Sequence, residues 1–251
     1  MTRLVADVFE AVLIDNLTGN TIGSTTLQSG AVEVSVQAND VRAGRGNQLI
    51  AVLTSDRDIN VTLSDAAFQY DWLAVQLGTN ITTGAGVAYT TPAWHTVSGA
   101  NTITLSPAPI ATNDMMRIFD NTGVEITRIG TAPTVNQYTI AGGVLTFNVA
   151  RANTQVEIRT YRYTSAAATQ TINIDNSRFP GGVTLILETL EINNNLTPTA
   201  RIQWVFTNAL PTGSFTVNTS SERTASAQDF SLRIVKPATS NIVGQVMRIP
   251  I

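Results

Sequence analysis

Cysteine is absent from the 251 residues, and histidine occurs only once, at position 95. Without cysteine the chain has no disulfide framework and no thiolate nucleophile. A zinc site uses three or four His, Cys or carboxylate ligands, so a single histidine without cysteine argues against one. No stretch approaches the roughly 18 apolar residues of a transmembrane helix, which argues against a membrane protein. The first fifteen residues do not match a signal peptide, because Asp7 and Glu10 interrupt their apolar run.

Charge is also scarce. Charged residues make up 13% of the chain, against roughly 25% in typical soluble domains. The formal net charge is -3, which does not favour binding to nucleic acid. Lys236 is the sole lysine, and the other basic residues are arginines, which suit fixed bidentate pairs with carboxylates. Such a surface indicates extensive cover by other subunits, although a Thr-rich secreted domain would have a similar composition.

Strand patterns dominate what is present. Residues 31–38 and 58–64 alternate apolar and polar side chains, which predicts half-buried strands. Residues 47–55 are more evenly apolar and predict a strand that could be covered on both faces. Short strands separated by turn residues recur over 102–163, and longer ones follow residue 170, including one over 213–220. The chain is therefore predicted to be mainly β.

One helix is expected, over residues 65–77. Ser64 is placed to cap it, Asp65 would complement the dipole in its first turn, and Gly78 is a natural stop. The apolar stripe that should pack this bracing helix on a sheet consists of Phe68, Trp72 and Val75.

A change of composition predicts two domains. Residues 79–101 are rich in glycine and threonine, and residues 164–169 have the composition of a linker. We therefore expect a discontinuous β domain formed by residues 1–79 and 169–251. Residues 80–168 would form a small β domain inserted after its helix.

The stretch "NDVRAGRGNQLI", residues 39–50, raises the question of a phosphate loop. A Walker loop needs a lysine and a hydroxyl after the last glycine, and a dinucleotide loop must open a helix. Here a strand pattern follows, so no nucleotide or other cofactor is expected. We expect the loop over residues 39–47 to contact acidic groups on its own fold or on a neighbouring subunit, with Arg42 and Arg45 pairing to carboxylates. The residues expected at an inter-subunit contact are Asp40, Arg42, Gly44, Arg45, Gly46 and Asn47.

No enzyme machinery is visible. The sequence contains no G-x-S-x-G elbow and no partner residues that would make His95 catalytic. His95 is therefore expected at a surface or an interface, and no catalytic residue is assigned. Asp56 and Asp58 could share a calcium ion, but their spacing fits a solvated turn better, and no metal site is assigned. Trp94, near Tyr89 in the sequence, could form a sugar-binding platform or instead pack between the two domains.

The run "VSVQANDVRAGRGNQLIAVLTSDRDINVTLSDAAFQYDWLAVQLG", residues 34–78, resembles the tail tube (major tail) proteins of long-tailed bacteriophages. The closing "INIDNSRFPGGVTLILETL" and "FSLRIVKP" resemble them too. This resemblance implies a β-sandwich of the phage tail-tube type with one flanking α-helix. It also implies self-assembly into stacked hexameric rings, with genomic DNA in the lumen bound without sequence specificity. An inserted domain would then face outward, because the lumen must stay open.

Residues and resemblance together predict a non-enzymatic structural protein of the virion tail, made in the host cytoplasm. Its partners would be further copies of itself and other tail proteins, such as the tape measure and the terminator. Two alternatives stay open. One is another virion part, namely a decoration, baseplate or capsid protein; the other is a β-rich adhesin or carbohydrate-binding module.

Overall fold

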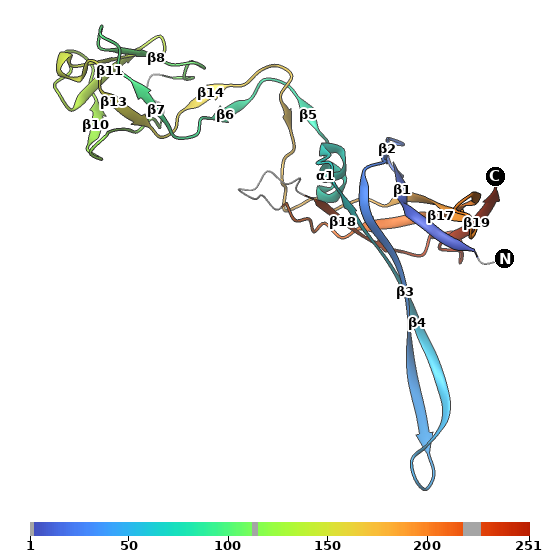
Figure 1. The fold of residues 1–251 in the computed structure, drawn as a ribbon. Helices are drawn as coiled ribbons and strands as arrows, with labels where there is room; N and C mark the ends of the chain where they lie inside the picture. Colours follow the sequence, from blue (N-terminus) through green and yellow to red (C-terminus); the bar gives the residue numbers. More distant parts are fainter. Residues whose placement is uncertain (1–2, 112–114, 218–226) are drawn as a thin grey trace. The chain divides into compact units, whose positions relative to one another are not determined.

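The structure is a computed structural model that describes residues 3–111, 115–217 and 227–251 (Figure 1). The chain is mainly β, as predicted, and α1 (Tyr70–Leu77) is the one α-helix in these ranges. It divides into two compact units. Unit 1 comprises residues 1–81 and 172–251, and unit 2 comprises residues 82–171.

Unit 1 is built on an eight-stranded sheet with the order β2-β1-β16-β17-β18-β4-β3, and β19 also pairs with β17. β18 and β19 lie along the same edge of β17, where β19 pairs with residues 200–205 and β18 with residues 209–211. The strands are β1 (Leu4–Asp15), β2 (Thr21–Ser24), β3 (Leu27–Ala43), β4 (Gln48–Asp65), β16 (Val183–Ile192), β17 (Pro198–Pro211), β18 (Gln228–Ile234) and β19 (Gln245–Pro250).

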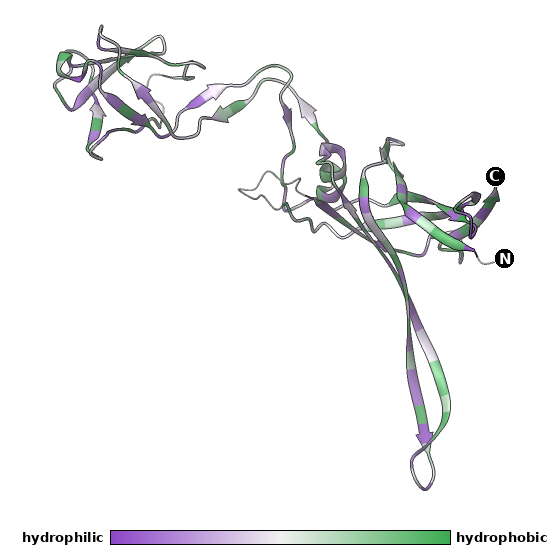
Figure 2. Ribbon diagram, viewed as in Figure 1, coloured by the Kyte–Doolittle hydropathy of each residue, from purple (hydrophilic) through white to green (hydrophobic). Residues whose placement is uncertain are grey.

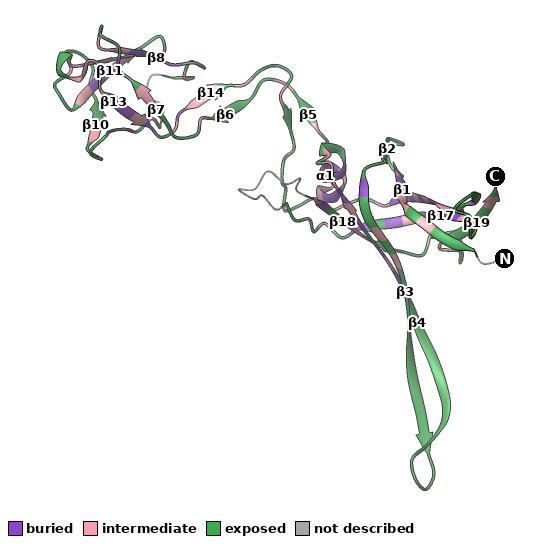
Figure 3. Ribbon diagram, in the orientation of Figure 1, coloured by how far each residue is buried: buried purple, intermediate pink, exposed green. Residues whose placement is uncertain are grey.

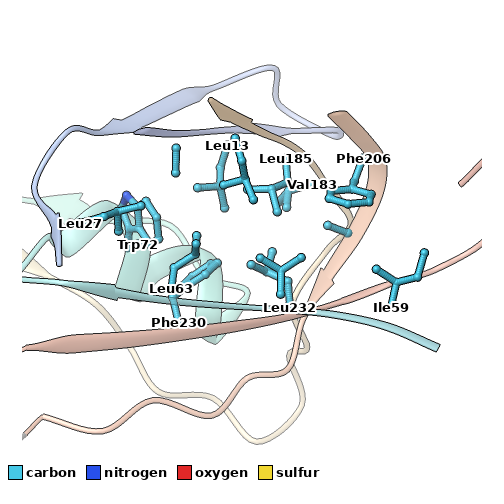
Figure 4. Close-up of a cluster of buried hydrophobic side chains, with 14 residues drawn as sticks. Leu13, Leu27, Ile59, Leu63, Trp72, Val183, Leu185, Phe206, Phe230 and Leu232 are labelled. Carbon is cyan, nitrogen blue, oxygen red and sulfur yellow. The ribbon is translucent and has the colours of Figure 1, made fainter. Parts of the chain in front are cut away.

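The sheet folds over so that distant strands line one core (Figure 4). Strand β16 alternates strictly, and its buried Leu185 and Leu187 point into this core. Leu13 of β1 lies across the core from Leu63 of β4 (Figure 4). At Gly30 of β3, an added Cβ would lie 2.8 Å from the ring of Phe9 on β1, so this close approach of two strands requires glycine.

Helix α1 starts later than predicted, at Tyr70, and ends as predicted before Gly78, which has a φ of 64°. Trp72 is 2% exposed, and its ring meets Phe230 edge-on at 4.6 Å between centroids. Val75 is partly buried against the same core. The expectation that Phe68 belongs to the helix is wrong, because it precedes the first turn and is 47% exposed.

Asp65 explains the delayed start of the helix. Its carboxylate is buried and accepts hydrogen bonds from the hydroxyls of Ser24 and Thr26, the latter at 2.6 Å. It also accepts the N–H of Ala67 at 2.8 Å and the side-chain amide of Gln69 at 3.0 Å. These bonds hold residues 65–69 in a turn, so Asp65 organises a connection and does not sit in the first helical turn. Ser64 is correspondingly a strand residue.

A second buried carboxylate fastens the last strand. Glu191 on β16 is 5% exposed and accepts two hydrogen bonds from the Arg248 guanidinium of β19, at 2.9 and 2.7 Å. The hydroxyl of Thr199 on β17 donates a third bond at 2.8 Å. The bonds from Arg248 outweigh the effect of burial and lower the pKa of Glu191 from 4.5 to about 2. Strand β19 is thus tied to the sheet by an ion pair as well as by its backbone.

Unit 2 contains a seven-stranded sheet in the order β7-β13-β9-β10-β11-β12-β8. Its buried side chains form a separate core that includes Ile118, Ile126, Leu145 and Val156. The strands of this sheet are β7 (Ala93–Thr96), β8 (Thr102–Thr104), β9 (Ile118–Asp120), β10 (Glu125–Arg128), β11 (Gln137–Ala141), β12 (Val144–Phe147) and β13 (Gln155–Ile158).

The chain enters and leaves unit 2 as two adjacent segments. Strand β5 (Thr82–Thr83) pairs with β15 (Gln170–Thr171), and β6 (Val87–Tyr89) pairs with β14 (Arg162–Thr164). Between these ladders, the N–H of Ser165 donates to the carbonyl of Gly86 at 2.9 Å. The segment 164–169, expected as a linker, therefore runs along a partner segment of the same unit.

Two further strand predictions differ from the structure. The strands expected over 47–55 and 58–64 are one continuous strand, β4, because a shift of register near residue 55 lets the pairing with β3 continue. For the strand expected over 213–220, Val217 forms an isolated bridge with Gln228, and residues 218–220 lie outside the described residues.

Candidate assembly site

The outer half of the β3–β4 hairpin forms an arm, which we define as residues 33–57. Every residue of the arm is exposed, whereas Ile59, Val61 and Leu63 on the same strand are buried in the core (Figure 3). The two strands of the arm pair with each other over most of its length. The arm is thus an extension of the core sheet beyond the body of unit 1.

The tip of the arm explains its two glycines. Residues 44–47 form the turn between the strands. Gly44 and Gly46 have φ values of 81° and 88°, and Asn47 has a φ of 50°. These are left-handed conformations that glycine, and to a lesser degree asparagine, adopt at low cost. The "RAGRGN" pattern therefore serves a tight hairpin turn. The expected loop over 39–47 is shorter than predicted, because residues 39–43 belong to β3.

Apolar side chains occupy both faces of the arm. Asp40 pairs with Val52, and the next pair along, Asn39 with Leu53, points to the opposite face because side chains alternate along a strand. Figure 2 shows the hydrophobic stretch that β4 contributes to the arm. The large apolar side chains of the arm are between 39% and 64% exposed, and they are Val34, Val36, Val41, Leu49, Ile50, Val52 and Leu53.

The charged residues near the tip are partly satisfied within the chain. The guanidinium of Arg42 pairs with the carboxylate of Asp40 at 2.8 Å, and both side chains are nearly half exposed. The two lie on one face because they are two residues apart in β3. Arg45, in the turn, has no ion-pair partner among residues 3–111, 115–217 and 227–251. The tip thus presents one paired and one free arginine.

At the base of the arm, Arg233 of β18 pairs with Asp58 of β4 at 2.6 Å. This ion pair raises the pKa of Arg233. Sequence reasoning considered Asp58 with Asp56 and did not find this partner, which is 175 positions away. The contact depends on the pairing of Arg233 with Asn60 across the sheet, which no local pattern reveals.

The remaining sequence candidates lie in unit 2. Trp94 and His95 are neighbours on β7, where Trp94 is 54% exposed and His95 is partly buried. Asp120 is buried, accepts bonds from the hydroxyl and N–H of Thr122, and pairs with Arg151 at 3.0 Å. These bonds, with Thr122 the largest influence, hold the pKa of Asp120 well below its ordinary value. Asp120 thereby holds the turn that follows it at residues 121–123.

Two kinds of feature are absent from the described part of the chain. None of its helices has the length and apolar character needed to cross a membrane. The same part of the chain also contains no group of three or more acidic or histidine side chains that could hold a metal ion.

Comparison with known proteins found a family model and solved structures that match this chain. The model of the YomU/Tube protein family matches residues 3–249. Among solved structures, this chain is similar to one in the cryo-EM structure of the anti-feeding prophage (AFP) baseplate, 6-fold symmetrised, with a TM-score of 0.41 and 9% identity. That similarity covers 98% of this chain and 97% of the other. No curated protein matches.

Proposed function

Since the chain belongs to the YomU/Tube protein family, we propose that it is the subunit of a phage tail tube. Six copies form a ring, and rings stack around a lumen through which DNA passes without sequence readout. The protein is then a non-enzymatic component of the virion tail, made in the host cytoplasm. It works with further tail proteins, such as the tape measure and the terminator.

The observation that supports this proposal best is the arm. A two-stranded hairpin is marginally stable by itself in water, and exposed apolar patches mark interaction surfaces. Here residues 33–57 are exposed on both faces, and both faces carry large apolar side chains. A single docking partner would cover one face only. Insertion between two neighbouring copies would cover both, as stacked rings allow.

The sheet supports a ring in a second way. Its order ends at β2 on one side and at β3 on the other, and an unpaired strand edge is a template for pairing with another chain. In the proposed ring, the sheet of each copy pairs with the next, so that a β-sandwich of the tail-tube type contributes to one continuous barrel around the lumen. Closure of the ring removes the free edges.

The composition also suits the proposed lumen. One lysine in 251 residues gives few mobile cations that could hold DNA phosphates by counterion release. The arginines are largely engaged in pairs such as Arg248 with Glu191. In the tube, unit 2 faces outward and leaves the channel open.

Electron microscopy of the purified protein at high concentration tests the proposal. We expect rings with six-fold class averages, or tubes once an assembly initiator is added. A protein that stays monomeric with the initiator present would contradict the proposal. Quantitative mass spectrometry of virions separates a tube subunit from a decoration, baseplate or capsid protein, since a tube requires a multiple of six copies proportional to tail length.

A further inference from the structure

The outer face of the unit 2 sheet carries a row of side chains that the tube proposal does not use. Across strands β7, β13, β9 and β10, four residues stand in register: Trp94, Glu157, Phe119 and Glu125. Register partners share a face of the sheet. The neighbouring residues Val156, Ile158 and Ile118 point to the opposite face and are fully buried in the core of the unit. The row is therefore on the solvent side.

Two arginines complete this surface. The guanidinium carbon of Arg159 lies over the ring of Phe119, 3.8 Å from the ring centroid, and the guanidinium carbon of Arg117 is 5.9 Å from the same centroid. We call the six residues the platform; they are Trp94, Arg117, Phe119, Glu125, Glu157 and Arg159. Trp94 is 54% exposed and stands on β7, the end strand of the sheet.

The charges of the platform cancel. Arg117 donates two hydrogen bonds to Glu125, at 2.9 and 2.7 Å, and Arg159 donates one to Glu157 at 3.3 Å. Pairing with Glu125 raises the pKa of Arg117 and lowers that of the carboxyl. Two cations and two anions are thus held in fixed positions along the row that begins with the exposed indole of Trp94. Because each arginine is paired with a glutamate, a strongly charged ligand that approached a side chain of opposite charge would be repelled by the neighbouring side chain of like charge.

We propose that the platform binds a neutral saccharide. A pyranose ring has an apolar C–H face that can stack on an indole, and its hydroxyls both donate and accept hydrogen bonds. Trp94 provides the stacking surface. Next to Trp94 in the row, Glu157 accepts hydrogen bonds from the saccharide hydroxyls and Arg159 donates hydrogen bonds to them. The hydrogen bond between these two side chains and the contact of Arg159 with Phe119 already hold them in place. Because β7 is the end strand of the seven-stranded sheet, a longer saccharide chain would extend over the sheet edge on the side of Trp94 away from Glu157.

The test uses the full-length protein on an array of neutral, sialylated and sulfated glycans, followed by saturation-transfer NMR with the neutral glycans that bind. We expect binding to neutral glycans only. Trp94→Ala should weaken it by about tenfold or more, the change that corresponds to about 1.4 kcal/mol of lost contact. Trp94→Phe should keep part of the affinity, because an aromatic face remains.

A matched control is Tyr89→Ala. Tyr89 is 60% exposed but belongs to β6, outside the seven-stranded sheet, so its loss should leave binding unchanged. Glu157→Gln should weaken the binding of neutral glycans and introduce binding of acidic glycans, because the positive charge of Arg159 then lacks its paired carboxylate. Thermal melting of each variant confirms folding. The proposal fails if the wild type binds none of the glycans, prefers acidic glycans, or binds equally well after Trp94→Ala.

Discussion

The double substitution Leu49→Ala with Leu53→Ala probes the arm most directly. Both leucines lie in the arm, on β4, and are 50% and 59% exposed. Neither leucine belongs to the buried core of unit 1, so the subunit should stay folded, and any loss in its free energy of unfolding should come from contacts within the arm. If neighbouring copies cover the arm, assembly should suffer while folding does not.

The size of the assembly defect follows from the exposed fractions. Each substitution removes three methylene-sized groups, and burying one contributes about 0.8 kcal/mol. Only the part still exposed in the free subunit, 50% for Leu49 and 59% for Leu53, is left for assembly to bury. The losses are therefore about 1.2 and 1.4 kcal/mol, and together they raise the critical concentration for assembly about 70-fold.

Light scattering and sedimentation over a concentration series measure that critical concentration, and electron microscopy identifies the product. The matched control is Leu17→Ala with Leu196→Ala, two leucines of unit 1 that are 92% and 76% exposed outside the arm. The control should assemble like the wild type. If the arm variant assembles at the wild-type concentration, the arm is not an interface; if it unfolds, the arm contributes to the fold.

Three further predictions concern charge and packing. Arg42→Glu with Arg45→Glu should give a subunit that is folded by circular dichroism but does not assemble in electron microscopy. Normal assembly of this variant would show that neither arginine is needed at the interface. Glu191→Gln should flatten the dependence of melting temperature on pH between 4.5 and about 2. In the wild type the Glu191 carboxyl has a lower pKa in the folded than in the unfolded chain, so its pairing with Arg248 stabilises the fold above pH 4.5, and this stabilisation is lost as the pH falls towards 2. An unchanged acid profile would show that other carboxyls control that range. Trp72→Ala should reduce the free energy of unfolding by about 3–5 kcal/mol in a denaturant titration, since a buried aromatic side chain leaves a cavity; a loss below about 1 kcal/mol would contradict its place in the core.

Local patterns predicted much of the fold. Alternation identified the strand around Val61, and Gly78 marked the end of the helix. The resemblance to phage tail tube proteins is confirmed by the family match over residues 3–249. The helix start was wrong because Asp65 has hydroxyl partners about 40 positions earlier, and a long-range hydrogen bond leaves no periodic signal.

The candidate site was predicted less completely. The glycines and arginines of residues 42–47 attracted attention because they are unusual in a strand region. The length of the arm was missed, because an evenly apolar run such as residues 47–55 has the same appearance whether its own fold or another molecule covers it. The platform of unit 2 was missed because its members come from four strands, and only their register brings them together. Trp94 was noticed from the sequence, whereas Arg117 and Arg159 were not.

The pairing of Thr82 with Thr171 has a practical consequence for engineering. Paired strands lie about 5 Å apart, so the two points where the chain enters and leaves unit 2 are neighbours. A foreign domain with adjacent termini can be grafted between these positions without stretching the chain. Removal of residues 82–171 likewise leaves ends that a short turn can join. This junction is therefore suited to displaying cargo from unit 1.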